Sequence, residues 1–406
     1  MKKSYFMLAA TAALFAACAE TDLVNEVNVV TEPQAIEFET FANKATRATE
    51  NSSASYSQDL GAHHQTFEVY AYKNVSDTKV FDNETVTYTA AVKDNAGNVL
   101  TNAKWSYEGL VYWDKTASEY NFYAAAPAAD YWVFNGIDKS TEAAPITKSS
   151  AYFTIASHPI VDHNASVAGK HAYVHAFNDV STDLMIASKE QVTSSSTQKL
   201  FEDVQLDFIH ILSRLNITVS KASSIASKVV TLKSLKVYNM NGTASFNEKN
   251  AADNALSDGT NARWTAATRT SINYTSLADE VLEVATAEKP AEYMLQSLVI
   301  PQNIEYESVP LDGTGKANFS KPYFCITYTI EDKKADGTVL SSEEFVVYYN
   351  LAAVFGATKS GDIVAFNEGW QNTLNITIEP SVITFTGNAA VWADGTPANT
   401  GSVTIE

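Results

Sequence analysis

Two histidines four residues apart are the first candidates for chemistry. His171 and His175 would lie on one face of a helix, where both rings could bind a metal ion. Zinc hydrolases with this spacing need a glutamate directly after the first histidine, and Ala172 stands there instead. The surrounding residues favour a loop or strand, in which these positions are about 13 Å apart. We therefore expect no metal site, and His158 and His163 do not change this expectation.

The other nucleophile and base candidates are not arranged for catalysis. His210 ends an apolar face, which is typical of a hydrogen-bonded core histidine. Cys325 has no patterned basic neighbour to lower its pKa, and we expect a buried or half-buried free thiol. The pairs Glu331-Asp332 and Glu343-Glu344 flank strands and turns, where solvated charges limit edge pairing. With no nucleophile-elbow, Walker or dinucleotide motif, we expect no catalytic residue, no cofactor and no enzymatic activity.

The composition favours a folded, β-rich chain. Its 406 residues suit two domains of roughly 150 to 200 residues each. Hydrophobic residues make up 45% and charged residues 18%, with 20 tyrosines and 19 phenylalanines, a balance that favours strands. The net charge of −19 argues against nucleic acid or an anionic lipid surface as a partner, because both require clustered lysine and arginine.

Residues 1–17 have the organisation of an export signal. Lys2 and Lys3 precede an apolar stretch from Tyr5 to Phe15, and small alanines follow. The apolar run is too short to span a bilayer comfortably, and no later run approaches the roughly 20 apolar residues of a membrane helix. We therefore expect the mature chain to lack a transmembrane helix.

Cys18 stands where a lipidated cysteine would. The preceding Leu14-Phe15-Ala16-Ala17 resembles the lipobox of bacterial lipoproteins, whose cysteine is acylated before the signal is removed. The chain has one other cysteine, so a disulfide framework does not explain Cys18. The alternative is ordinary signal cleavage with Cys18 as a bystander. Glu20 and Asp22 resemble the export tag of surface lipoproteins.

A short strand and a basic site follow a tether at residues 19–35. Ile36-Glu37-Phe38-Glu39 alternates with period two, which predicts a strand with Ile36 and Phe38 on its buried face. Arg47 and Ala48 come next, followed by small polar residues typical of an exposed loop. A strand, a basic site and a loop in this order invite proteolysis.

From residue 67 onward the pattern predicts one strand after another. The predicted strands are Phe67–Tyr72, Val204–His210, Leu215–Val219, Val230–Tyr238, Glu292–Ile300, Tyr323–Ile330, Phe345–Leu351, Leu374–Ile378 and Val382–Phe385. Turn signals stand at Asp94–Asn98, Asn241-Gly242, Asp312-Gly313 and Asp336-Gly337. The apolar phase flips near Ser213-Arg214, where we expect a bulge or bend between two sheets and a domain junction just after it. Ser276–Ala285 is the best of few helix candidates.

Six segments in order over nearly the whole chain resemble the fimbrillin family of Bacteroidetes pili. They are Lys44–Ala48; Tyr112-Trp113 with Tyr120–Pro127; Asp183–Ala187; Val204–Leu215; Leu298–Gln302; and Gly369 with Leu374–Ile378. The resemblance implies an all-β fold of two tandem transthyretin-like β-sandwich domains with few short helices. It also implies lipoprotein export and removal of the N-terminal segment by an Arg-specific protease. The lost first strand then leaves a groove that a C-terminal strand of the next subunit fills, because an open sheet edge is a template for another chain.

The resemblance gives this sequence a domain plan and a set of site residues. Residues 1–17 are the signal peptide, 18–47 the lipidated propeptide, 48–222 and 223–387 the two sandwiches, and 388–406 a C-terminal appendage. Arg47 and Ala48 flank the processing site, and Ile36 and Phe38 mark the displaced first strand. The candidate donor-strand residues are Val391, Trp392, Val403 and Ile405.

The expected partners and location follow from the same resemblance. The partners are other fimbrillin subunits, the Arg-specific protease and, before maturation, the outer membrane through the lipid anchor. The chain would be an outer membrane lipoprotein first and a cell-surface fimbrium afterwards, with a structural role in adhesion.

The alternative is a surface adhesin or a tip or accessory lipoprotein that binds glycan or protein and does not polymerise. Tyr131, Trp132 and Phe134 could stack on sugar rings or belong to a core. The stretch Asn388–Glu406 does not read as one strong strand, and some tip fimbrillins lack a donor strand. A secreted glycosidase has no support beyond the abundance of acidic residues.

Overall fold

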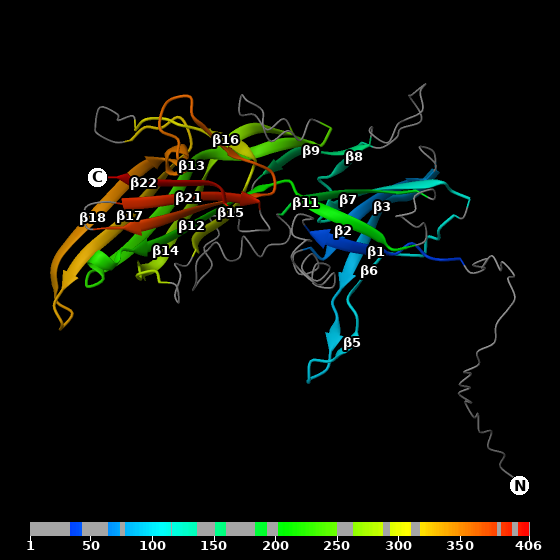
Figure 1. The fold of residues 1–406 in the computed structure, drawn as a ribbon, viewed down its shortest axis with the longest axis horizontal. Helices are drawn as coiled ribbons and strands as arrows, with labels where there is room; N and C mark the ends of the chain where they lie inside the picture. Colours follow the sequence, from blue (N-terminus) through cyan, green and yellow to red (C-terminus); the bar gives the residue numbers. More distant parts are fainter. Residues whose placement is uncertain are drawn as a thin grey trace, which may run out of the picture. The chain divides into compact units, whose positions relative to one another are not determined.

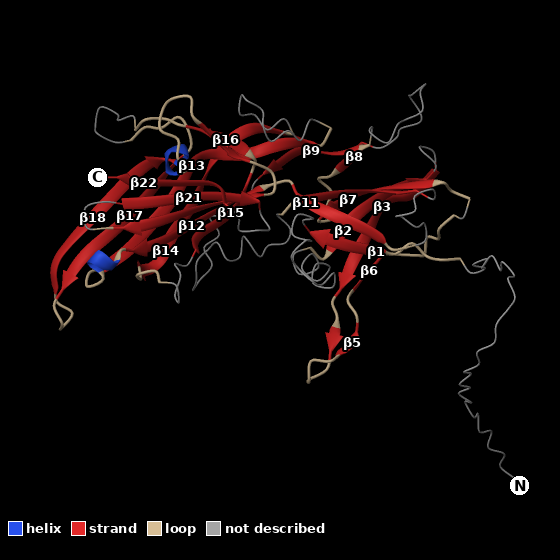
Figure 2. Ribbon diagram, viewed as in Figure 1, coloured by secondary structure: helices blue, strands red, loops and turns tan. Residues whose placement is uncertain are grey.

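A computed structural model describes most of the chain and is nearly all strand (Figure 2). The described residues are 33–42, 64–73, 78–114, 116–135, 151–159, 183–192, 202–249, 263–286, 293–309, 317–379, 383–391 and 397–405. Among them the helices are the single turns η3 (Ser223–Ile225) and α3 (Leu351–Val354). The all-β class is therefore confirmed. No helix in these ranges is long and apolar enough to cross a membrane.

The chain divides into two units, Met1–Gln34 and Ala35–Glu406, and nearly all described residues belong to the second. The first sheet of this unit has seven strands in the order β1-β11-β10-β7-β2-β3-β6 (Figure 1). Its strands are β1 (Phe38–Ala42), β2 (Thr66–Lys73), β3 (Thr78–Thr89), β6 (Lys104–Ser106), β7 (Glu119–Ala126), β10 (Met185–Val192) and β11 (Val204–His210).

This sheet curls around its own core. Three strands separate β1 from β2 in the strand order, yet the ring centroids of Phe38 on β1 and Phe67 on β2 are 5.8 Å apart. Phe122 of β7 and Phe208 of β11 are buried in the same cluster. The alternation of apolar residues along each strand places one face of every strand toward this cluster. The first core is therefore enclosed by strands that are distant in the sequence.

Two further sheets pack face to face, and most of their strands come from the second half of the chain. The five-stranded sheet has the order β15-β12-β20-β21-β22 and contains β12 (Ser213–Lys221), β15 (Tyr293–Val299), β20 (Trp370–Ile378), β21 (Ile383–Val391) and β22 (Pro397–Ile405). The other contains β8 (Val133–Asn135), β9 (Tyr152–Pro159), β13 (Val229–Asn247), β14 (Trp264–Val281), β17 (Tyr323–Lys333) and β18 (Val339–Asn350).

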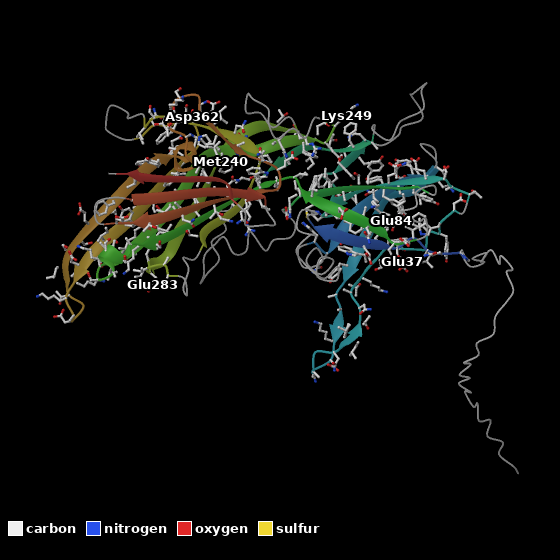
Figure 3. The ribbon with its side chains drawn as sticks, in the orientation of Figure 1. Glu37, Glu84, Met240, Lys249, Glu283 and Asp362 are labelled. Atoms are coloured by element: carbon white, nitrogen blue, oxygen red, sulfur yellow. The ribbon has the colours of Figure 1, made fainter. Side chains whose placement is uncertain are left out.

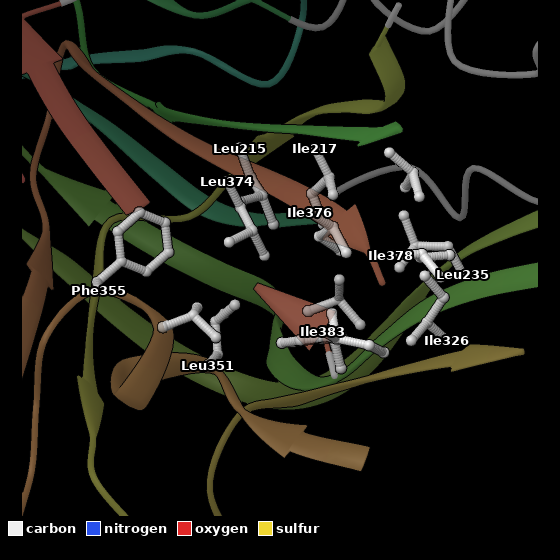
Figure 4. Packing of buried hydrophobic residues seen from close by; sticks show 14 of the residues in the cluster. Leu215, Ile217, Leu235, Ile326, Leu351, Phe355, Leu374, Ile376, Ile378 and Ile383 are labelled. Carbon is white, nitrogen blue, oxygen red and sulfur yellow. The ribbon is translucent and has the colours of Figure 1, made fainter. Parts of the chain in front are cut away.

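The core between these two sheets is aliphatic. Figure 4 shows Leu215 and Ile376 from one sheet close to Leu235 and Ile326 from the other. All four side chains are fully buried. This is sandwich packing, in which the inner faces of two sheets interdigitate.

The chain crosses between sheets where the apolar phase flips. β11 ends at His210 in the first sheet, and β12 begins at Ser213 in the five-stranded sheet. The predicted change of sheet is confirmed. The expected domain boundary between residues 222 and 223 stays a prediction. β12 lies before this boundary but pairs with β15 and β20, which lie after it. β9 also lies before it and pairs with β13.

Local predictions had mixed outcomes. The turns at Asp94–Asn98 and Asp336-Gly337 are confirmed, with Gly97 and Gly337 at positive φ of 86° and 85°, a region that glycine adopts without strain. The prediction of a turn at Asn241-Gly242 is wrong, because β13 continues through these residues with shifts in its register against β14. The helix at Ser276–Ala285 is also wrong, since β14 extends to Val281 along β13. Asp312-Gly313 lies outside the described residues.

Two small ribbons complete the fold. β16 (Gln302–Glu305) pairs with β19 (Ile363–Phe366) beside the second core. β4 (Val92–Lys93) pairs with β5 (Val99–Thr101) and extends away from β6 (Figure 1).

Candidate functional site

The backbone of the first strand is held within its own chain. β1 runs parallel to β11, with Phe38 opposite Val204 and Ala42 opposite Phe208. The Val204 amide donates to the Glu37 carbonyl at 2.7 Å, and the Ile36 amide donates to the Val111 carbonyl at 2.8 Å. β1 is the last strand in the order of its sheet. An edge position means that its removal would break pairing with one described strand, β11.

The side chains of this segment close the first core. Ile36 is fully buried and Phe38 is 5% exposed, which confirms the predicted buried face. Glu37 between them is exposed (Figure 3). Phe38 lies against the rings of Phe67, Phe81, Tyr107 and Phe122, with centroids between 5.4 and 6.1 Å away.

Tyr107 fastens the start of the segment to the core. Its hydroxyl donates to the Ile36 carbonyl at 2.8 Å, while its ring packs against Phe38 at 5.9 Å. Burial raises the pKa of Tyr107, so its hydroxyl keeps its proton and remains a donor near neutral pH. The sequence reasoning did not select Tyr107, because no local pattern links it to residue 36.

The processing and lipidation residues cannot be placed. Cys18, Arg47 and Ala48 lie outside the described residues. The described chain ends at Ala42 in β1 and resumes at His64, two residues before β2. The proposed cleavage site therefore falls within the interval between these two strands.

The C-terminal segment forms a hairpin at the edge of the five-stranded sheet. β21 pairs antiparallel with β20, with Trp370 opposite Val391. β22 pairs antiparallel with β21, with Ile383 opposite Ile405 and Phe385 opposite Val403. β22 is the last strand of its sheet. The expected start of the appendage at residue 388 falls inside β21, and Trp392 lies outside the described residues.

A half-buried carboxylate, Asp183, joins two histidines beside the crossing from β11 to β12. His210 Nδ1 lies 3.0 Å from Asp183 Oδ2, and His64 Nε2 lies 3.8 Å from the same oxygen. Burial raises the pKa of Asp183, but the two histidines outweigh it and hold the pKa well below its usual range. His210 is hydrogen-bonded, as predicted, but it is half-buried at the end of β11 and not enclosed in a core. His64 was missed, since its partner is far away in the sequence.

Glu68 lies buried near this group. Its side chain is 3% exposed, and its Oε1 atom has no hydrogen-bond partner among the described residues. Burial raises its pKa to about 7, and the charge of Asp130 adds to the effect. No group of three or more histidine, cysteine or carboxylate side chains that could hold a metal ion occurs in the described ranges. His158 is in β9, whereas His163, His171 and His175 lie outside those ranges.

The aromatic run at residues 131–134 belongs to a core. Trp132 is 6% exposed, and its indole NH donates to the Pro127 carbonyl at 3.0 Å. Phe134 stacks on Tyr70 with centroids 4.1 Å apart, and Tyr131 packs against the same cluster. Of the two alternatives for these aromatic residues, the structure supports packing in a core.

Cys325 is a buried free thiol, as expected. Burial raises its pKa, although hydrogen bonding with Tyr348 opposes the shift. A thiol with a raised pKa is a poor nucleophile at neutral pH. The carboxylates of Glu343 and Glu344 are exposed on β18.

Residues 46–392 match the sequence profile of a family described as fimbrillin-like. This span covers most of the 406 residues. The chain belongs to the fimbrillin-like family. The resemblance based on six segments is thus confirmed. Fimbrillin-like membership supports a role as a pilus or adhesin subunit at the cell surface.

Solved structures resemble this chain at low sequence identity. A fimbrial protein from Bacteroides vulgatus matches this fimbrillin-like chain with a TM-score of 0.52 and 14% identity, covering 89% of this chain and 100% of that one. A candidate cell adhesion protein from Bacteroides uniformis matches at 0.41 and 15%, covering 89% and 98%. Another from Bacteroides ovatus matches at 0.42 and 11%, covering 90% and 100%. A search of curated protein sequences finds no match.

Proposed function

We propose that this chain is a structural subunit of a cell-surface pilus that polymerises by strand exchange. It would be exported as an outer membrane lipoprotein through Cys18 and cut by an Arg-specific protease between Arg47 and Ala48. The observation that carries the proposal is β1: an edge strand that closes the first core and precedes the cut. Cutting after Arg47 would separate β1 covalently from every other strand.

Loss of β1 would leave a specific vacancy in the first core. Phe67, Phe81 and Phe122 would lose the Phe38 ring, and β11 would lose its parallel partner. Burial of one large apolar side chain stabilises a fold by roughly 1.5–3 kcal/mol, so refilling the groove is favourable. An added strand also satisfies the unpaired amides and carbonyls of the edge.

β22 is the proposed donor. It is an edge strand whose removal would break pairing with β21. Val403 and Ile405 alternate as Ile36 and Phe38 do, so one face of β22 has the spacing that the groove requires. We assign the donor to residues 397–405 rather than to 388–406, because Asn388–Val391 are the end of β21. Val391 and Trp392 would then connect the donor to the sheet.

We also propose that the chain has two sandwich domains. One sandwich would be built around the groove and the other around the aliphatic core of Leu215 and Ile376. The second sandwich would begin near Ser213 instead of residue 223, since β12 pairs with β15 and β20.

One observation favours the non-polymerising alternative. β22 already pairs with β21 in its own chain, so release of the donor costs that pairing. A tip or accessory adhesin would keep β22 paired in its own chain and donate no strand, so it would be the last subunit of a fibre.

Treatment of the purified protein with an Arg-specific protease tests the proposal. Strand exchange predicts a ladder of oligomers on a gel after cleavage, because each copy gains an acceptor groove and offers a donor strand. An Arg47→Ala variant is the matched control and should give no ladder in the same assay, because its β1 stays covalently attached. A cleaved protein that yields no ladder would support the adhesin or tip alternative instead.

A further inference from the structure

The β4–β5 arm, defined as residues 90–104, is a ribbon with almost nothing packed on it. β3 pairs with β6 only up to Thr89 opposite Lys104, and the arm continues beyond this point (Figure 1). Val92, Val99 and Leu100 are 51%, 52% and 66% exposed. A two-stranded ribbon is marginally stable in water by itself. Exposed apolar side chains on such a ribbon therefore indicate a surface that a partner covers.

The tip of the arm is nevertheless well formed. Asp94 accepts hydrogen bonds from the amides of Ala96 and Asn98 and from the Asn98 side chain, at 2.8–2.9 Å. Gly97 supplies the positive φ of the turn. The carboxylate of Asp94 is thus occupied by its own turn, and its pKa is lowered by these hydrogen bonds.

The remaining charges of the arm are positive. Lys93 and Lys104 are both exposed, and no ion pair joins either of them to a described residue. The chain as a whole has 28 basic and 47 acidic residues. A cationic arm on an acidic chain complements the surface of another copy of that chain, because opposite potentials attract across an interface.

β18 offers an edge with matching properties. It is a 12-residue strand at the end of its sheet, so one side of its backbone pairs with no strand that the structure describes. Val339, Leu340 and Val346 on it are 46%, 61% and 49% exposed. Glu343 and Glu344 lie between these apolar residues, are exposed, and form no ion pair with any residue in the described ranges.

We propose that the β4–β5 arm of one copy binds along the open edge of β18 in a second copy. The contact joins apolar residues of both ribbons, pairs Lys93 and Lys104 with Glu343 and Glu344, and adds a strand to an unpaired edge. The same carboxylates repel the β18 edge of another copy, which prevents two such edges from pairing. Because different surfaces meet, the contact can repeat from copy to copy, as a weak, salt-sensitive association that is distinct from the strand-exchanged fibre.

This contact is independent of strand exchange, so an Arg47→Ala background is used to test it. Sedimentation of the purified protein at low ionic strength should show self-association that weakens in high salt, since exposed charge pairs are screened. Lys93→Glu with Lys104→Glu should weaken association about tenfold, and Glu343→Lys with Glu344→Lys should do the same. The four changes together should restore it. Lys359→Glu, an exposed lysine elsewhere, is the control and should have no effect.

A second measurement does not depend on affinity. Mixing a Leu100→Cys copy with a Leu340→Cys copy under mild oxidation should give a disulfide-linked dimer, whereas neither variant alone should. A protein that stays monomeric at all concentrations, or a charge-reversed combination no better than either pair alone, would overturn the proposal. Binding of the arm to an anionic glycan without self-association would overturn it as well. The ladder produced by Arg-specific cleavage is a separate readout, so either proposal can fail alone.

Discussion

Phe38 meets Phe67 edge to face, with ring centroids 5.8 Å apart and ring planes at 88°. Phe38 belongs to the segment before the proposed cut, and Phe67 to the first strand after it. The pair therefore joins a part of the chain that maturation would remove to a part that it would retain. Edge-to-face geometry adds about 0.5–1.5 kcal/mol to the burial of such rings.

Phe38→Ala should destabilise the uncleaved protein by about 3–5 kcal/mol, because it empties a site enclosed by four aromatic rings. Urea unfolding measures the loss. Glu37→Ala is the matched control, since Glu37 is exposed directly before the same strand, and it should change stability by less than about 0.5 kcal/mol. Equal losses for the two variants would mean that β1 is not part of the first core.

Glu68→Gln should stabilise the protein at alkaline pH. The pKa of Glu68 is raised from 4.5 to about 7, so between these values the folded state binds more protons than the unfolded state. Stability therefore falls as pH rises from 4.5 to 7. Since one pKa unit corresponds to about 1.4 kcal/mol, the variant should gain up to roughly 3 kcal/mol at pH 8 and little at pH 4. A stability difference between variant and wild type that does not change with pH would contradict burial of a titrating Glu68. Glu108→Gln, at an exposed site, is the control.

Asp183→Asn should destabilise the protein at neutral pH by about 1.5–3 kcal/mol, because the charged partner of His210 and His64 is lost. The pKa of Asp183 is lowered in the folded state, so its contribution is present above its ordinary pKa and is lost as pH falls below it. The gap between variant and wild type should therefore shrink in acid. Asp203→Asn at an exposed position is the control, and a gap as large in acid as at neutral pH would count against the ion pair.

Much of the fold was predictable from local patterns. The period-two alternation identified β2, β11, β12, β17 and β20, since each has one face on a core. Ile36 and Phe38 were identified in the same way. The switch of sheets after His210 also left a local signal, because a change of sheet reverses which residues face inward.

The failures came from long-range pairing. Asn241-Gly242 has the composition of a turn, but β13 pairs there with β14 and β9. Shifts in the register of the β13–β14 pair accommodate these two residues within the strand. The apolar spacing in residues 276–285 suited a helix, yet pairing with β13 determines a strand. His64 and Tyr107 depend on partners brought near by the curled sheet, which no nearby sequence pattern encodes.

Cys18→Ser should abolish acylation of the exported chain, because the thiol is the proposed point of attachment. Metabolic labelling with a lipid precursor measures this directly. Precursor should accumulate, or unlabelled protein should be released from the cell. Lipid label that persists on the variant would refute the assignment, and Cys325→Ser, a buried thiol within β17, is the control that should keep its label.

The direct test of strand exchange is electron microscopy of cells whose sole subunit lacks residues 397–406. Removal of β22 leaves β21 paired with β20, so the truncated chain should fold, be exported and be cleaved after Arg47. An Ile405→Asp variant keeps the strand but places a charge at a proposed donor position, and it separates loss of the donor from loss of folding. The account predicts exported, cleaved subunits and no extended fibres for both variants. Fibres of normal length from either one would contradict the assignment of β22 as the strand that replaces β1.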